Sequence, residues 1–118
     1  MIDIHSHILP EIDDGSRNIE ETIAMITEAY KNGITAIIAT SHYMEGTYEV
    51  NKNKREEMVN ILQEILTIKE LPVKIYIGAE AYILPNLAKK IKNNEIPTLN
   101  NSKYLLFELP MNTPYLNL

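Results

Sequence analysis

Two histidines near the start of the chain have the spacing of a metal-binding pair. His5 and His7 flank Ser6 at the end of an apolar start, residues 1–4. In an extended strand, residues i and i+2 project to the same face, so both imidazoles can reach one ion. Neutral imidazole suits zinc, manganese or iron, and a strand that opens into a loop leaves coordination positions for water and substrate. The alternative interpretation is a pair of ordinary surface or core histidines.

Three further candidate ligands stand next to runs that have the composition of strands. His42 follows residues 37–41, Glu80 follows residues 73–79, and Glu108 closes residues 104–107. In α/β folds, functional sites are built at the carboxyl ends of the strands. All three histidines of the chain belong to this set, which favours a shared metal centre over chance.

An alternation of strands and helices must position these residues. Asn18, with Glu21 three residues later, has the pattern of a helix N-cap, and Gly33 predicts the end of that helix. Strands are predicted over residues 34–40, 73–79 and 104–109, in addition to the one at the start. A second helix follows the polar loop of residues 41–51 and ends before Pro72. Its predicted apolar face consists of Met58, Ile61, Leu62, Ile65 and Leu66.

A short third helix is predicted after Pro85, and Pro97 ends that segment before the last strand. The resulting order, β-α-β-α-β-α-β, predicts a parallel sheet with right-handed crossovers. No linker or internal repeat divides the chain, so residues 1–118 are expected to form a single domain. A complete α/β barrel needs about eight βα units. This chain supplies four.

Composition narrows the functional classes. The chain has 118 residues, of which 45% are hydrophobic and 23% charged, and its formal net charge is -5. The acidic balance argues against sequence-independent nucleic-acid binding, which depends on clustered basic side chains. The absence of cysteine excludes disulfides and thiolate metal sites and suits a reducing compartment. No apolar run approaches the length of a membrane span, so a cytoplasmic location is expected.

Several stretches together resemble a known family. MIDIHSHILPEIDDGSRNIEET, ATSHY, GAEAYI, IPTLNNSKYLLFELP and MNTPY resemble the N-terminal half of bacterial PHP-domain protein-tyrosine phosphatases of the CpsB/YwqE type. The motifs agree in order and spacing along essentially the whole chain. The resemblance implies a distorted β/α barrel of seven strands, of which this chain would form about four βα units.

The resemblance also implies a cluster of up to three divalent ions, usually manganese, although iron, zinc or cobalt would suit the same donors. By analogy, His5 and His7 would bind the first ion. Glu80 would bridge it to a second ion, and Glu108 would complete the second site.

The third ion would be held by Asp14 and His42, with Asp13 as a substitute for Asp14. The family's remaining ligands, and an arginine that helps hold phosphate, come from a later segment that has no counterpart in these residues. From the residues themselves, Asp3 is a further candidate that would orient His5 or His7 through a hydrogen bond, and the alternative is a solvent-facing residue at the start of the strand. Catalysis would use a metal-activated water, and the residues assigned to it are His5, His7 and Glu80.

The implied function is metal-dependent phosphomonoester hydrolysis, with the phosphorylated tyrosine-rich tail of a bacterial autokinase of capsule or exopolysaccharide synthesis as substrate. One alternative is a PHP phosphoesterase for a small phosphate ester. Another is a catalytically inert fragment that binds metal or oligomerises, because the chain looks truncated at its C-terminal side. Half a barrel exposes two sheet edges and the apolar faces of the first and fourth predicted strands, so we also expect a homo-oligomer.

Overall fold

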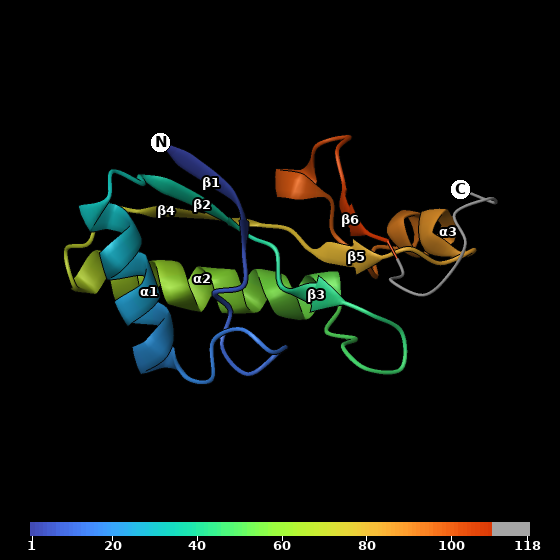
Figure 1. Cartoon of the computed structure of the whole chain (residues 1–118), viewed down its shortest axis with the longest axis horizontal. Helices are drawn as coiled ribbons and strands as arrows, with labels where there is room; N and C mark the ends of the chain where they lie inside the picture. The colour runs from blue at the N-terminus through green and yellow to red at the C-terminus, as the bar shows by residue number, and fades with distance from the viewer. Residues whose placement is uncertain (110–118) are drawn as a thin grey trace.

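The computed structural model describes residues 1–109 of the 118-residue chain. Its strands form two parallel three-stranded sheets, with the orders β1-β2-β4 and β3-β5-β6. Helix α2 runs along both sheets, whereas α1 lies beside the first sheet and α3 beyond the second (Figure 1). The elements in chain order are β1 (Ile2–Ser6), α1 (Ile19–Lys31), β2 (Ala36–Ala39), β3 (His42–Tyr43), α2 (Lys52–Ile68), β4 (Lys74–Ile77), β5 (Glu80–Tyr82), α3 (Leu87–Lys92), a 3-10 helix (Leu99–Asn101) and β6 (Leu106–Glu108).

The prediction of one continuous parallel sheet is wrong. The predicted strand over residues 34–40 is shortened to β2, and the chain forms a second short strand, β3, after a break at residues 40–41. The predicted strand over residues 73–79 likewise breaks at residues 78–79 and continues as β5. His42 and Glu80 therefore begin short strands and lie opposite each other in the ladder between β3 and β5.

A close approach of the chain helps to explain the second break. A Cβ atom at position 78 would lie 2.8 Å from the Ile38 Cγ2 atom and 3.2 Å from the Thr40 Cγ2 atom. Gly78 therefore lets β4 pass close to the end of β2, and a larger residue would push the two strands apart. The last strand, β6, is shorter than predicted and pairs with β5.

The helix boundaries largely follow their capping residues. The Asn18 side chain accepts a hydrogen bond from the Glu21 amide, as predicted, and Asn51 accepts one from Lys54 at the start of α2. Gly33 follows α1 with a φ of 90°, a conformation that glycine adopts without strain. Among the helices within residues 1–109, none is both long and apolar enough to cross a bilayer.

The predicted apolar face of α2 is partly wrong. Ile61 is 57% exposed, and Met58 and Ile65 are only partly covered. The 3.6-residue period instead directs a neighbouring stripe toward the sheets. The buried residues of α2 are Arg55, Val59, Leu62 and Leu66.

The main core lies between the first sheet and helices α1 and α2. Ile26 from α1, Ile37 from β2, Ile75 from β4 and Leu66 from α2 all contribute to one buried cluster. A smaller cluster beneath the second sheet contains Tyr43, Ala79, Ala81 and Ile96. The two cores hold the strands in place at the point where both sheets meet.

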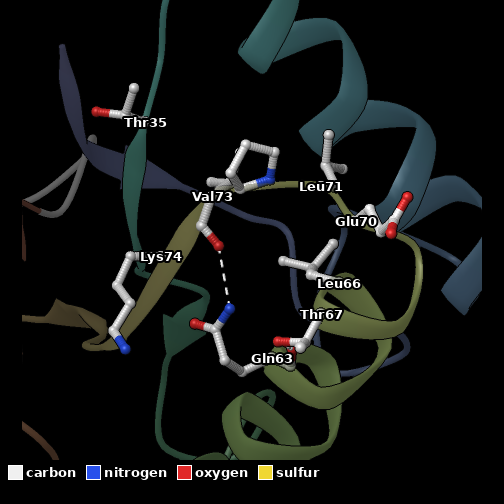
Figure 2. A pocket seen from close by; sticks show the side chains of 9 residues that line it. Thr35, Gln63, Leu66, Thr67, Glu70, Leu71, Val73 and Lys74 are labelled. Atoms are coloured by element: carbon white, nitrogen blue, oxygen red, sulfur yellow. Dashed lines mark hydrogen bonds between the residues drawn. The ribbon is translucent and has the colours of Figure 1, made fainter.

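The free edge of β4 is covered by a side chain. The Gln63 Nε2 atom donates to the Val73 carbonyl at 3.1 Å, and its Oε1 atom accepts from the Ile75 amide at 2.8 Å. This pair of bonds imitates a neighbouring strand and protects the edge from pairing with another chain. Figure 2 shows Gln63 beside Val73, in a hollow of about 390 Å³ at the amino end of β4.

Two strands at the sheet edges carry exposed apolar side chains. Ile2 and Ile4 on β1 are 62% and 56% exposed, and Phe107 on β6 is 52% exposed. These are the two strands that the sequence predicted to have uncovered apolar faces. The MNTPY stretch of the family resemblance, residues 111–115, lies outside the described residues.

Candidate metal centre

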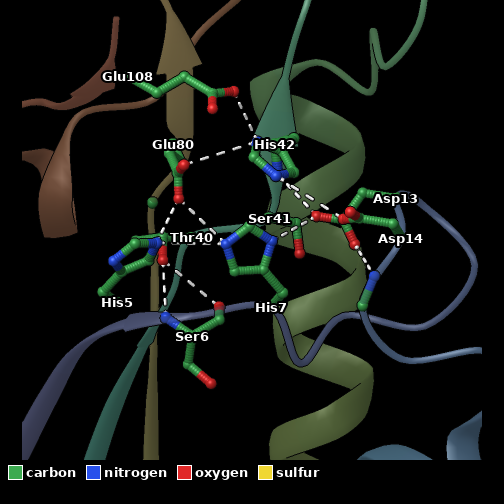
Figure 3. A network of polar contacts seen from close by, with 12 residues as sticks. His5, Ser6, His7, Asp13, Asp14, Thr40, Ser41, His42, Glu80 and Glu108 are labelled. Atoms are coloured by element: carbon green, nitrogen blue, oxygen red, sulfur yellow. Dashed lines mark hydrogen bonds and ion pairs between the residues drawn. The ribbon is translucent and has the colours of Figure 1, made fainter. Parts of the chain in front are cut away.

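All the side chains predicted to form the site converge where the two sheets meet, in the middle of the molecule (Figure 1). His5 lies on β1 and His7 directly follows it, and a loop over residues 7–18 leads from there into α1. Figure 3 shows these side chains pointing toward one another. The potential ligand atoms within each group lie within 4.8 Å of one another, and the three groups are His5–His7–Glu80, His42–Glu80–Glu108 and His7–Asp13–Asp14–His42.

Two of the three contacts in the first group have the distances found between neighbouring ligands of one ion. The Nε2 atoms of His5 and His7 are 3.3 Å apart, and the His7 Nε2 atom lies 3.1 Å from the Glu80 Oε2 atom. The His5 Nε2 atom also contacts the Glu80 Oε2 atom. With metal–ligand distances near 2.1 Å and angles of about 90–110°, neighbouring ligands lie roughly 3.0–3.4 Å apart. The donor set therefore fits a divalent ion.

Asp13 orients the imidazole of His7. Its Oδ2 atom lies 2.8 Å from His7 Nδ1 and accepts a hydrogen bond from the His42 amide at 2.8 Å. The hydrogen bond with Asp13 raises the pKa of His7, although burial of the ring opposes it. When His7 Nδ1 donates to this carboxylate, the Nε2 lone pair faces His5 and Glu80.

The carboxylate of Asp13 is completely buried and has its own supporting contacts. Burial acts to raise the pKa of Asp13. The hydrogen bonds from His7 and from the amides of His42 and Gly15 outweigh it, so the pKa falls below its usual value. Asp13 is therefore ionised at neutral pH and accepts all three bonds.

The prediction that Asp3 orients a histidine ring is wrong. Its Oδ1 atom accepts a hydrogen bond from the backbone amide of His5 at 3.0 Å and does not bond to either ring. Asp13 reaches His7 because the loop after β1 turns back over it. A Cβ atom at Gly15 would overlap the His7 backbone oxygen and come within 2.6 Å of the His7 Cβ atom. Only glycine permits this close approach.

The second group contains two shielded polar atoms that face each other without a hydrogen bond. The His42 Nδ1 and Glu108 Oε1 atoms lie 2.9 Å apart, yet neither has a hydrogen-bond partner among the described residues. Glu80 Oε1 lies 3.8 Å from the same His42 nitrogen. Unpartnered buried polar atoms are costly, and a cation held by Glu108, or a hydrogen bond donated to Glu108 by a protonated His42 Nδ1, would remove that cost.

Asp14 is placed differently from Asp13. Its side chain is 70% exposed, and its Oδ1 atom lies 3.7 Å from the His42 Nε2 atom. His42 thus presents one nitrogen to Asp14 and the other to Glu108. Because neutral imidazole has a single lone pair, His42 can ligate on one side only and donates a hydrogen bond on the other.

Sequence reasoning missed two contributors to the site. Thr40 accepts a hydrogen bond from the Ser6 amide at 2.8 Å, where the register between β1 and β2 shifts. Arg55 is fully buried beneath the ends of the strands. The sequence could have indicated this burial, because Arg55 lies on the same helical stripe as Val59, Leu62 and Leu66, at spacings of four, three and four residues.

The comparisons with known proteins agree with this geometry. The family model described as "Capsular polysaccharide synthesis, CpsB/CapC" matches residues 1–118. The chain belongs to the CpsB/CapC family. This result confirms the family predicted from the sequence motifs.

Individual members of the CpsB/CapC family show how far the similarity extends. The tyrosine-protein phosphatase CpsB of Streptococcus pneumoniae is 42% identical over 117 residues, which cover 98% of this chain and 47% of that protein. The tyrosine-protein phosphatase YwqE of Bacillus subtilis is 34% identical over 110 residues, which cover 93% of this chain and 43% of that protein. The chain therefore spans about half the length of these relatives.

A solved structure from the CpsB/CapC family has the same mixed α/β fold. It comes from crystal structures of YwqE of B. subtilis and CpsB of S. pneumoniae, described as unique metal-dependent tyrosine phosphatases. The TM-score is 0.91 at 34% identity, and the match covers 98% of this chain and 47% of the other. The metal dependence is described for those proteins. In this chain, the potential metal ligands are the donor groups around His5, His42 and Glu80.

Proposed function

We propose that this chain is a module of a metal-dependent phosphomonoester hydrolase, specifically a manganese-dependent protein-tyrosine phosphatase. The observation that carries the proposal is the set of three adjoining donor groups, in which Glu80 and His42 each belong to two groups. The two oxygens of the Glu80 carboxylate can each reach a different ion, whereas His42, with its single lone pair, can ligate only one of them. The relatives named tyrosine-protein phosphatases support the reaction class.

We assign the ligands as the family resemblance implied them. His5, His7 and Glu80 would hold one ion, Glu80 and Glu108 a second, and His42 and Asp14 a third. Asp14 suits this role better than Asp13, because both oxygens of Asp13 already accept hydrogen bonds.

The proposed hydrolysis depends on the positive charge that divalent ions would bring to the centre. Divalent ions supply an activated water at neutral pH and stabilise the charge on the phosphoryl oxygens during transfer. Glu80 fixes the spacing between the two positions, and Asp13 keeps the His7 lone pair directed at the centre. His5, His7 and Glu80 are thus the residues closest to the reaction. His5 is the most open of the three, with a side chain that is 52% exposed, so substrate can approach from its side.

The same proposal also specifies the fold and the substrate in more detail. We infer a single PHP-type domain over residues 1–118 that forms about four βα units of a seven-stranded distorted TIM barrel. We propose as substrate the phosphorylated tyrosine tail of an autokinase that controls capsule or exopolysaccharide synthesis. The family description supports the link to capsule synthesis. A cytoplasmic location is consistent with the cysteine-free composition.

The proposal predicts manganese-dependent phosphate release from a phosphotyrosine peptide by the purified chain. Release should stop on chelation, return on adding Mn²⁺, and be lost in a His5→Ala, Glu80→Ala double variant that retains its circular dichroism spectrum. Histidinol phosphate serves as the competing substrate. Faster turnover of the small ester would contradict the protein substrate, and metal binding without turnover of either would indicate a non-catalytic module.

We further propose that this chain associates with a second copy through the apolar side chains of β1 and β6. The support is the exposure of Ile2, Ile4 and Phe107 on edge strands, where unpaired strands favour association. Light scattering should show a dimer or a larger oligomer. An Ile2→Lys, Phe107→Lys variant should become monomeric, whereas the control Ile68→Lys, at an exposed position of α2, should not. A monodisperse wild-type monomer would refute this prediction.

A further inference from the structure

Arg55 makes an unusual set of contacts for an arginine on a helix. Its side chain is completely buried, and its guanidinium donates only to backbone carbonyls. Nε donates to Val50 at 2.7 Å, and Nη2 donates to His42 at 2.6 Å. Nη1 donates to both Ser41, at 2.7 Å, and Gly78, at 3.2 Å. Within residues 1–109, no carboxylate forms an ion pair with it.

Three of these four carbonyls, those of Ser41, His42 and Gly78, lie at or directly beside the two places where the strands break, and the fourth, that of Val50, lies just before α2. Ser41 stands between β2 and β3, directly before His42, and Gly78 stands between β4 and β5, two residues before Glu80. The Ser41 carbonyl also accepts a hydrogen bond from the Glu80 amide at 3.2 Å. One guanidinium therefore connects the two bends from which His42 and Glu80 enter the centre.

The burial of this group is costly. Desolvation lowers the pKa of Arg55 to about 10, and the nearby Asp13 and Tyr43 only partly offset this effect. A buried charge without a paired carboxylate needs several hydrogen bonds to be tolerated. A helix that only covered an apolar core would be served as well by an aliphatic residue on the stripe of Val59 and Leu62.

We propose that Arg55 is a positioning residue of the metal centre, whose guanidinium ties the two strand breaks together so that His42 and Glu80 face common ions. Lysine cannot replace it, because an ammonium is a point donor that lacks the planar fork able to reach carbonyls on two segments. This inference rests on the proposed metal centre for its functional meaning. The tie between the breaks is a property of the metal-free chain and can be tested separately.

The first measurement uses the metal-free protein. Amide hydrogen exchange is compared between wild type, Arg55→Lys and Arg55→Met, with Lys54→Met as a matched control because Lys54 is an exposed cation on the same turn. The Arg55 variants should exchange faster at the amides of His42 and Glu80, while the amides of Ile38 in β2 and Tyr76 in β4 keep their rates. Unchanged exchange at His42 and Glu80 would overturn the proposal.

The second measurement is a titration with Co²⁺ followed by its visible absorption. Arg55→Lys should bind Co²⁺ about tenfold or more weakly, as expected when a residue that supports metal ligands is lost. Leu66→Ala, on the same helix but in the main core, lowers the melting temperature without touching the strand breaks, so its affinity should stay near wild type.

The outcomes separate positioning from general stability. If affinity falls in Leu66→Ala as much as in Arg55→Lys, metal binding follows stability and the positioning role is wrong. If Arg55→Lys does not fold, Arg55 supports the fold as a whole and the proposal is also wrong. Failure of the wild-type chain to bind Co²⁺ would refute the metal centre, and hydrogen exchange would still decide whether Arg55 ties the two breaks.

Discussion

A Glu80→Gln variant is expected to lose about 10³-fold in manganese-dependent phosphate release, which corresponds to about 4 kcal/mol of transition-state stabilisation. Glu80 belongs to two of the three donor groups, and its two oxygens face different histidines. The amide keeps the shape of the side chain but removes the negative charge that would attract two neighbouring cations in the proposed centre. Both neighbouring ion positions should therefore weaken at once.

Two variants make this prediction specific. Glu108→Gln changes a carboxylate that belongs to a single group, so it should cost less than Glu80→Gln. Glu64→Gln, at an exposed position of α2, should have no effect. Bound metal per chain should be measured alongside activity. A Glu80→Gln protein with wild-type metal content and activity within a fewfold of wild type would contradict the bridging role.

An Asp13→Asn variant is expected to bind metal about 10–100-fold more weakly while keeping all the assigned ligands. Asp13 accepts bonds at His7 Nδ1, at the His42 amide and at the Gly15 amide. An asparagine has one acceptor oxygen, so its NH₂ group must face at least one of these donors. If the asparagine keeps its oxygen toward His7 and His42, its NH₂ group opposes the Gly15 amide, and a neutral oxygen holds both residues less strongly than a carboxylate does.

Asp3→Asn is the control for this prediction. Asp3 bonds to the His5 backbone amide and not to a ring, so the substitution should change metal affinity by no more than a fewfold. Affinity is measured by calorimetric titration with Mn²⁺ on samples whose folding is checked by circular dichroism. Equal losses in Asp3→Asn and Asp13→Asn would mean that the effect comes from negative charge near the centre and not from orientation of His7.

The clustering of the site could be predicted from the sequence because it depends on simple geometry. Two histidines at i and i+2 on a strand share a face, and their Nε2 atoms are 3.3 Å apart. Parallel pairing places His42 opposite Glu80 in the ladder between β3 and β5. Glu108 lies two residues further along the next strand, opposite Tyr82, and its side chain reaches back to His42. The helix-capping residues Asn18 and Gly33 could also be predicted, because capping depends on only a few neighbouring residues. The structure confirms both ends of the helix.

The roles of the two aspartates in the loop could not be predicted in this way. Asp13 and Asp14 are neighbours in the chain, yet one side chain is fully buried against His7 and the other is open to solvent. The difference arises from the path of the loop, which turns back so that the Ser16 amide donates to the His7 carbonyl at 3.1 Å. The local sequence Asp13-Asp14-Gly15 does not specify that path.

The burial of Arg55 was even harder to predict from the sequence than the roles of the two aspartates. Charge alone places an arginine on the surface, and only its place on the apolar stripe of α2 hinted otherwise. The amino-acid sequence by itself determined the family, the order of strands and helices, and the ligand types that meet at the strand ends. The tertiary structure alone decided where the strands break, which aspartate orients His7 and how Arg55 is buried. These features depend on hydrogen bonds between residues distant in the chain, whereas periodicity and capping depend only on near neighbours.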